Sequence, residues 1–230
     1  MKLINQVWAF IPARSGSKSI RNKNLLILKK KPLIAHSLNV AKKCKIFKKI
    51  IFSSDSDKYY NIAKKFAKIY FHKRSKKISG DNTTDFEVFY DFVKNFKGNL
   101  PMFFVHLRPT TPFRRSKDIE KIVRKFIINQ KKFSSLRSVS IMSNPSYKSV
   151  TIRNNKLFSP IFNSFQLDKI NLPRQKYEST FIPNGYIDII KTKSIIKGFL
   201  HGNKVMPYIN KNYISDIDVK KDFEIARLIN

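Results

Sequence analysis

The 230-residue sequence predicts an α/β fold in which a mostly parallel sheet is flanked by helices. Between residues 7 and 142, short continuous apolar runs alternate with segments whose apolar residues recur at helical spacing, which is typical of strands joined by crossover helices. Polar loops follow several of these runs, and ligands of parallel sheets bind beyond the carboxyl ends of the strands. No linker or repeat interrupts the pattern, so residues 1–230 are predicted to form a single domain.

The first strand is expected at residues 7–12, VWAFIP, because a continuous apolar run of this length is typical of a buried parallel strand. Further strands are expected at residues 49–53, 69–71, 102–107 and 136–142. Helices are expected at residues 32–44, 57–67, 82–96 and 116–129. Asp81 is predicted to open the third of these helices, and Ser116 to cap the fourth.

The rest of the chain is less regular. A hairpin is expected at residues 150–158, around Asn154 and Asn155, and residues 180–190 surround an Asn184–Gly185 pair. This pair has two readings, a hairpin turn or a turn that precedes a core strand, and Pro183 favours the second. Another strand is expected at residues 205–209 and a final helix at residues 219–229. Residues 159–178 carry few periodic signals, so residues 150–180 are predicted to form an excursion from the core.

The composition excludes several classes of protein. Hydrophobic residues make up 42 % of the chain and include 20 Phe, which is enough for a buried core. The single cysteine, Cys44, cannot form an internal disulfide and is expected to be a packed thiol. No apolar run is long enough for a membrane span or a signal-peptide core, so a cytoplasmic protein without a membrane partner is expected.

The net charge of +32 leaves one alternative of a different class, a basic nucleic-acid-binding protein. Nucleic-acid binders usually concentrate their charge in a tail, a stripe or one helix. Here Lys and Arg occur in almost every segment, so nucleic-acid binding is not expected to be the main function. A basic surface would still steer anionic substrates toward a site.

A loop with the composition of an anion site, residues 11–24, directly follows the first predicted strand. Its sequence, IPARSGSKSIRNKN, contains four cations among small residues that allow close approach. The cations are Arg14, Lys18, Arg21 and Lys23. The spacing of a P-loop is absent, so the loop itself indicates only an anion site.

An acidic motif near the end of the chain, SDIDVKKDF, is unusual in a sequence with only 15 acids. On an extended segment, Asp216 and Asp218 would face the same way, and two hard oxygen ligands suit Mg²⁺. Asp222 fits the N-terminus of the last helix. A second motif, SSDSD at residues 53–57, contains Asp55 and Asp57. These two acids are predicted to have structural roles rather than to be metal ligands.

Two further motifs follow predicted strands. LRPTTPFR, residues 107–114, has two prolines that would make a rigid loop. HKRSKKISGDNTT, residues 72–84, places Arg74 seven residues before Asp81. No histidine is placed as a general base, and His106, on a buried strand, is expected to be a satisfied core residue.

Together these motifs resemble the acylneuraminate cytidylyltransferase family over roughly residues 7–229. The first motif is similar to the family signature xxPARxGSKxxxxKNL, with Ser19 where a second glycine is usual. The resemblance implies a Rossmann-like nucleotidyltransferase fold. Arg108 stands where many sialic acid synthetases have Gln, which leaves the sugar open.

The resemblance also implies the roles of individual residues. Those implied to bind the nucleotide, CTP, are Arg14, Ser15, Gly16, Lys18, Lys23, Asn24, Arg74, Asp81, Thr83 and Arg108. Those implied to bind an acidic sugar are Arg108, Thr110, Lys148, Arg174, Asn184 and Gly185. Asp216 and Asp218 are implied to bind Mg²⁺, and Arg14, Lys23 and Asp218 to be catalytic.

The implied reaction transfers CMP from CTP to a 2-keto sugar acid and releases pyrophosphate. The acceptor stays open between a sialic-acid-like nonulosonate and 3-deoxy-octulosonate. The excursion at 150–180 resembles, in position, the family's dimerisation element that reaches into a partner's site, so a homodimer is expected.

Overall fold

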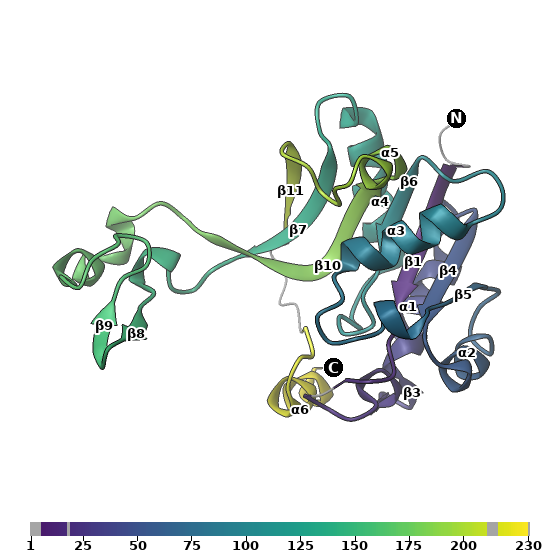
Figure 1. The fold of residues 1–230 in the computed structure, drawn as a ribbon, viewed down its shortest axis with the longest axis horizontal. Helices are drawn as coiled ribbons and strands as arrows, with labels where there is room; N and C mark the ends of the chain where they lie inside the picture. Colours follow the sequence, from purple (N-terminus) through teal and green to yellow (C-terminus); the bar gives the residue numbers. More distant parts are fainter. Residues whose placement is uncertain (1–5, 18, 211–215, 230) are drawn as a thin grey trace.

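The computed structural model describes residues 6–17, 19–210 and 216–229. Its centre is a seven-stranded sheet in the order β11-β7-β10-β6-β1-β4-β5 (Figure 1). Only β10 runs antiparallel to its neighbours among these strands. The strands are β1 Val7–Pro12, β4 Lys49–Ser54, β5 Tyr70–Lys73, β6 Phe103–His106, β7 Ser135–Ile141, β10 Phe181–Lys191 and β11 Val205–Ile209. The predicted mostly parallel sheet is therefore confirmed.

Helices cover both faces of this sheet, and β1 shows why its sequence is apolar throughout. Alternate side chains of β1 enter the two cores: Val7 packs with α1, α2 and α4, whereas Trp8 packs with α3 and α5. The helices are α1 Leu33–Lys43, α2 Asp57–Ala63, α3 Asp85–Asn95, α4 Ser116–Asn129, α5 Thr192–Ile196 and α6 Lys220–Leu228. Among the described residues, no helix is both long and apolar enough to cross a membrane.

The last helix, α6, packs at the edge of the molecule where β1 ends (Figure 1). Ala226 and Phe223 of α6 form a small third core with Leu28, Leu33 and Ile217. Leu28 belongs to a short hairpin made by β2 Ile27–Leu28 and β3 Lys31–Pro32. This packing brings the C-terminal acidic motif next to the N-terminal loop, although they are far apart in sequence.

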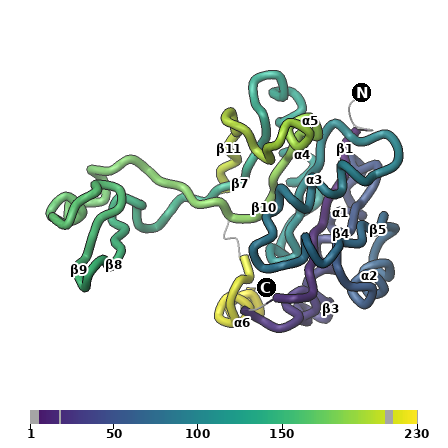
Figure 2. The backbone as a smooth tube through the Cα atoms, viewed as in Figure 1, coloured from purple at the N-terminus to yellow at the C-terminus, as the bar shows by residue number. Residues whose placement is uncertain are grey.

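The chain between β7 and β10 projects away from the sheet, as the tube in Figure 2 shows. It contains the antiparallel hairpin of β8 Thr151–Arg153 and β9 Lys156–Phe158. Both turn residues, Asn154 and Asn155, have positive φ, at 48° and 58°, as a tight hairpin of this kind requires. The predicted hairpin is therefore confirmed.

Two predicted helix caps are wrong. α3 begins at Asp85 rather than at residue 82, because Thr84 caps it: the Thr84 hydroxyl accepts from the Glu87 amide, and the Glu87 carboxylate accepts from the Thr84 amide. Asp81 pairs with Arg14 instead. Ser116 is the first residue of α4 rather than its cap, and no side chain caps that helix.

Several other elements differ from the sequence-based expectation. α2 ends at Ala63 rather than at residue 67, and α5 and the β2–β3 hairpin were not predicted. The Asn184–Gly185 pair makes no hairpin turn. It lies inside β10, where the pairing with β7 shifts register between Pro183 and Asp188.

Candidate active site

A cleft of about 510 Å³ opens at the carboxyl ends of β1, β5 and β6. This volume lies within the range of about 300–1,000 Å³ usual for small-molecule sites. Nine predicted site residues line it: Arg14, Lys23, Asn24, Arg74, Asp81, Thr83, Arg108, Thr110 and Asp218. The topology explains this gathering, because the carboxyl ends of parallel strands meet at one edge of a sheet.

The loop after β1 is fixed by side chains on both sides. Asp55, just after β4, accepts hydrogen bonds from the Ser15 amide at 2.9 Å and the Ser15 hydroxyl at 2.6 Å. Burial raises the pKa of Asp55, but these hydrogen bonds outweigh burial and hold it below its ordinary value. Asn24 donates to the Arg14 carbonyl at 3.0 Å. Asp55 thus shapes the loop, whereas Lys18 lies outside the described residues.

Two predicted cations of the cleft are paired with carboxylates. Arg14 Nη1 lies 2.8 Å from Asp81 Oδ1, and Lys23 Nζ lies 2.9 Å from Asp218 Oδ1. The Lys23 side chain is only 11 % exposed, against 70 % for Asp218, so the lysine is fixed and the aspartate is accessible. An anion that binds Arg14 and Lys23 would exchange with these carboxylates.

Arg108 is clamped between two acids at the base of the cleft. Its Nη1 donates to Asp188 and its Nη2 to Asp85, each at 2.7 Å. Burial lowers the pKa of Arg108, but the two carboxylates outweigh it and raise the pKa. The sequence prediction missed Asp85 and Asp188, although a lone acid in the apolar run IDII was a signal for Asp188.

His106 was expected to be satisfied, and this prediction is wrong. The side chain is fully buried beside Asp188, with Nδ1 3.9 Å from the Asp188 carboxylate, and neither ring nitrogen has a hydrogen-bond partner. Burial and the nearby Arg108 lower the pKa of His106 to about 3. The imidazole is therefore neutral at ordinary pH and lies outside the cleft lining.

Arg114 holds the cleft loops together and was not predicted as a site residue. Its guanidinium donates to backbone carbonyls of Tyr186 at 2.5 Å, Gly185 at 2.8 Å and Arg108 at 2.9 Å, and also to that of Thr111. These bonds tie the loop after β6 to the bulge in β10. The signal in the sequence was an arginine that ends the rigid LRPTTPFR motif.

Gly185 allows the acidic motif to approach the bulge. A Cβ at Gly185 would lie 3.0 Å from Asp216 Oδ2 and 3.0 Å from Thr111 Oγ1, and its φ of +67° disfavours other residues. Asp216 Oδ1 is buried without a hydrogen-bond partner. Burial, together with the charge of Asp218, raises the pKa of Asp216. The site therefore holds a carboxylate with an unsatisfied oxygen.

Asp222 caps α6 and so is separate from this carboxylate pair. It accepts from the Asp218 amide and the Val219 amide, both at 2.9 Å. Within the described ranges, no three His, Cys, Asp or Glu side chains come together as a metal-binding group. Mg²⁺ in proteins often uses one or two carboxylates with substrate phosphates and water. Of the two predicted ligands, Asp218 lines the cleft, whereas Asp216 is not part of its lining.

The predicted sugar-side residues fall into three groups. Arg108 and Thr110 line the cleft. Asn184 and Gly185 lie behind it in the bulge, where the Asn184 side chain bonds Ser140 and the Tyr186 amide. Lys148 and Arg174 lie on the projecting segment between β7 and β10, away from the cleft of the same chain (Figure 1).

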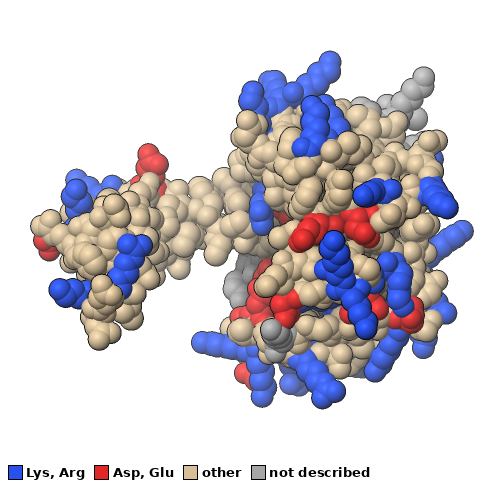
Figure 3. All heavy atoms as spheres, viewed as in Figure 1, with Lys and Arg blue, Asp and Glu red and all other residues tan. Residues whose placement is uncertain are grey.

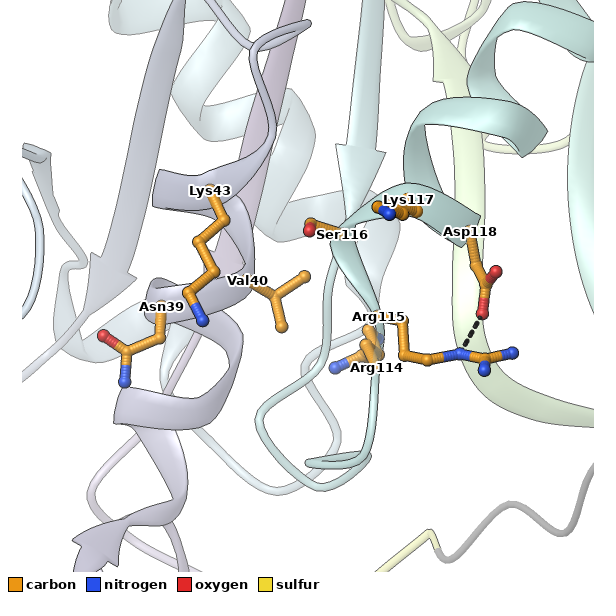
Figure 4. Close-up of a pocket in the computed structure, with 8 residues that line it drawn as sticks. All are labelled: Asn39, Val40, Lys43, Arg114, Arg115, Ser116, Lys117 and Asp118. Carbon is orange, nitrogen blue, oxygen red and sulfur yellow. Dashed lines mark hydrogen bonds and ion pairs between the residues drawn. The ribbon is translucent and has the colours of Figure 1, made fainter.

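A second hollow of about 450 Å³ lies between α1 and the start of α4 (Figure 4). Lys43 of α1 faces it, and the dashed line in Figure 4 marks the ion pair between Arg115 and Asp118 at 2.8 Å. None of the predicted site residues lines this hollow.

Comparison with known proteins identifies the family of the chain. Residues 8–218 match the family model described as cytidylyltransferase. The chain is 31 % identical over 229 residues to the N-acylneuraminate cytidylyltransferase of Escherichia coli O18:K1:H7, covering 96 % of this chain and 51 % of that protein. It is 26 % identical over 226 residues to the CMP-N,N'-diacetyllegionaminic acid synthase of Legionella pneumophila, covering 96 % and 94 %. The chain thus spans about half the length of some curated relatives and nearly all of others.

Solved structures share the fold. The structure of a CMP:2-keto-3-deoxy-manno-octonic acid synthetase complexed with CTP superposes with a TM-score of 0.68 at 15 % identity, covering 96 % of this chain and 97 % of that one. The predicted Rossmann-like nucleotidyltransferase fold is thereby confirmed. Since the family model covers nearly the whole sequence, the chain belongs to the cytidylyltransferase family.

Proposed function

We propose that the chain transfers CMP from CTP to a sialic-acid-like 2-keto sugar acid and releases pyrophosphate. The observation that carries this proposal is the cleft itself, where Arg14 and Lys23 lie opposite Asp218 at the carboxyl edge of the sheet. The relatives named above, for N-acylneuraminate and for diacetyllegionaminic acid, favour a nonulosonate acceptor. The structural neighbour named for 2-keto-3-deoxy-manno-octonic acid is 15 % identical to this chain and supports the fold rather than that acceptor.

In this proposal the triphosphate lies over the loop after β1. Arg14, Lys18 and Lys23 hold its phosphates and stabilise the charge that develops on the leaving pyrophosphate. Phosphate oxygens would replace Asp81 on Arg14 and Asp218 on Lys23, because both ion pairs lie at the cleft. The reaction is an in-line displacement at the α-phosphorus, so positioning and charge neutralisation supply most of the rate.

When phosphate replaces Asp218 as the partner of Lys23, Asp218 is released and can join Asp216 as a pair of oxygen ligands. The unsatisfied Oδ1 of Asp216 supports this role, since a buried carboxylate oxygen without a partner is costly unless something binds it. Mg²⁺ is the ion that such a pair suits. When bound, it supplies neutralisation of phosphate charge.

The sugar acid would bind beyond the α-phosphate, near Thr110 and the Arg108 clamp. Because Asp85 and Asp188 neutralise Arg108, the carboxylate of the sugar needs another cation. Lys148 and Arg174 are candidates from the projecting segment, and in a homodimer that segment could reach the cleft of a partner. Its exposed apolar side chains support an interface: Ile152, Leu157, Phe165 and Leu172 are 45–72 % exposed.

The proposal is tested by pyrophosphate release with CTP, Mg²⁺ and a panel of 2-keto sugar acids. We expect turnover with at least one nonulosonate, and a loss of about 100-fold or more in Asp218→Asn. Asp57→Asn is the matched control, because Asp57 pairs with Lys73 and does not line the cleft. Near-normal turnover in Asp218→Asn would contradict the role of Asp218, and no turnover across the panel would contradict the activity.

A further inference from the structure

Four side chains form a continuous hydrogen-bonded chain from α3 to the cleft. Asp91 Oδ2 lies 2.9 Å from His72 Nε2, and His72 Nδ1 lies 2.9 Å from Ser53 Oγ. Arg74 Nε donates to the same Ser53 hydroxyl at 2.8 Å, and Arg74 Nη2 donates to the Ser53 carbonyl at 3.1 Å. Ser53 and His72 are direct partners in the parallel pairing of β4 and β5, so the sheet itself sets this contact.

The direction of each hydrogen bond follows from the chemistry of Arg74. A guanidinium only donates, so Ser53 Oγ must accept from Arg74 and is free to donate its single proton to His72. His72 Nδ1 is then the acceptor, and the ring proton sits on Nε2, from which it is donated to Asp91. Only the neutral Nε2–H form of His72 satisfies all four groups.

The end of this chain lies in the proposed nucleotide site. Arg74 lines the cleft, and its side chain is largely buried within reach of the charges of Asp55, Asp85 and Arg14. Two of its five N–H groups bond Ser53. The orientation of the others is therefore set by the Ser53 hydroxyl, whose own orientation is set by His72.

We propose that Asp91, His72 and Ser53 form a relay that fixes Arg74 for nucleotide binding. His72 and Asp91 are thus positioning residues that do not touch the substrate. This inference rests on the proposed function, because it assigns Arg74 to the nucleotide. None of the three was assigned a role from the sequence, although His72 is the first residue of the motif HKRSKKISGDNTT.

The relay makes nucleotide binding sensitive to acid. Asp91 from α3, Ser53 from β4 and Arg74 after β5 face His72, as do the rings of Phe10 and Phe92. Burial lowers the pKa of His72 against the opposing attraction of Asp91, so the ring is neutral at neutral pH. Protonation at lower pH turns Nδ1 into a donor, and the buried Ser53 hydroxyl then loses its acceptor.

Two variants of His72 separate the relay from simple packing. His72→Phe keeps an aromatic ring but removes the acceptor, whereas the side-chain oxygen of His72→Asn can accept near the place of Nδ1. We expect His72→Phe to raise KM for CTP about tenfold, with a smaller change in kcat, because the lost interaction is made in the ground state as well. His72→Asn should restore most of the affinity, and Ser53→Ala should behave like His72→Phe.

The pH profile is the second measurement. As the pH falls below 6.5, the ordinary pKa of a histidine, KM for CTP should rise more steeply in the wild type than in His72→Asn, whose amide does not titrate. The protonation of CTP itself is common to both proteins and cancels in this comparison. His36→Asn is the matched control, since His36 bonds the Leu28 carbonyl outside the relay, and it should follow the wild-type profile.

Calorimetric CTP binding and thermal unfolding complete the test. If His72→Phe and Ser53→Ala are folded and turn over CTP with an unchanged KM, the relay is wrong while the proposed function stands. If His72→Phe does not fold, the test rests on how KM for CTP changes with pH in the wild type and in His72→Asn. If these two pH profiles coincide, the relay is wrong. If the folded wild type neither binds nor turns over CTP, the proposed function and the relay both fail.

Discussion

Asp216 is placed where its charge costs stability. One carboxylate oxygen is buried without a partner, the other lies against Gly185, and burial raises the pKa of the group. Residues arranged for function often reduce the stability of the fold in this way. The conflict at Asp216 is resolved if the carboxylate binds a cation.

We therefore expect Asp216→Asn to increase the free energy of unfolding in metal-free buffer by about 1 kcal/mol. The amide removes the buried charge and keeps the shape of the side chain. The same substitution should abolish Mg²⁺-dependent turnover and any stabilisation of the protein by Mg²⁺. Urea unfolding with and without Mg²⁺ measures this, with Asp57→Asn as the surface control. A variant that is less stable than the wild type without metal would show that Asp216 is structural.

At the scale of single elements, α3 depends on its cap. The reciprocal bonds of Thr84 and Glu87 satisfy backbone groups at the first turn. The cap also fixes where the helix begins, and hence the positions of Asp85, which clamps Arg108, and of Asp91, which bonds His72. The cap of α3 therefore bears on both the Arg108 clamp and the hydrogen bond to His72.

We expect Thr84→Ala to lower the free energy of unfolding by about 1 kcal/mol, whereas Thr84→Ser should be nearly neutral, since serine keeps the hydroxyl. Urea denaturation measures both, and an unchanged m-value shows that the unfolded state is not altered. Equal stabilities of the two variants would mean that the cap contributes nothing.

The elements were predictable to different degrees for physical reasons. β1, β11 and α4 begin and end at the predicted residues, because β1 and β11 are continuous apolar runs and α4 has apolar residues at regular helical spacing. α3 was placed too early because Asp81 and Thr84 are both good caps. The choice depends on Arg14, which binds Asp81 from a distant loop and is invisible to a local pattern.

The residues of the candidate site were also predictable to different degrees. Most of the cleft-lining cations and acids were predictable because they lie in loops that follow strands or in one dense acidic motif, whereas the cleft-lining Asp85, at the start of α3, was not. The ion pairs between these residues were not predictable. Lys23 and Asp218 are separated by 195 residues, and Arg108 lies beside Asp188 because β6 pairs with β10. Long-range ion pairs depend on topology and register, which a single sequence does not specify.

At the scale of the whole molecule, charge is spread rather than concentrated. On the face in Figure 3, Lys and Arg project around the body, while Asp and Glu gather toward its middle. This distribution agrees with a net charge of +32 that comes from the whole sequence. A general positive potential would raise the encounter rate with CTP, and that rate should fall as salt increases.

The projecting segment between β7 and β10 contributes nothing to the cleft within a single copy of the chain. It carries Lys148 and Arg174 far from the cleft of its own chain, and it exposes apolar residues. In a symmetric dimer, each segment would serve the cleft of the other copy. The complete site would then contain residues from two chains.

This arrangement predicts activity in a mixture of two inactive proteins. Asp218→Asn damages the cleft, and Arg174→Ala damages the segment, so neither homodimer has a complete site. After subunits exchange, half of the dimers are mixed, and one of the two sites in each combines an intact cleft with an intact segment. Pyrophosphate release should then recover to about a quarter of the wild-type value. A mixture of Asp218→Asn with Asp216→Asn is the control, because both changes damage the cleft and no complete site forms. If the first mixture is no more active than its two components alone, although size-exclusion chromatography shows dimers that exchange, each cleft must bind its sugar without the partner's segment.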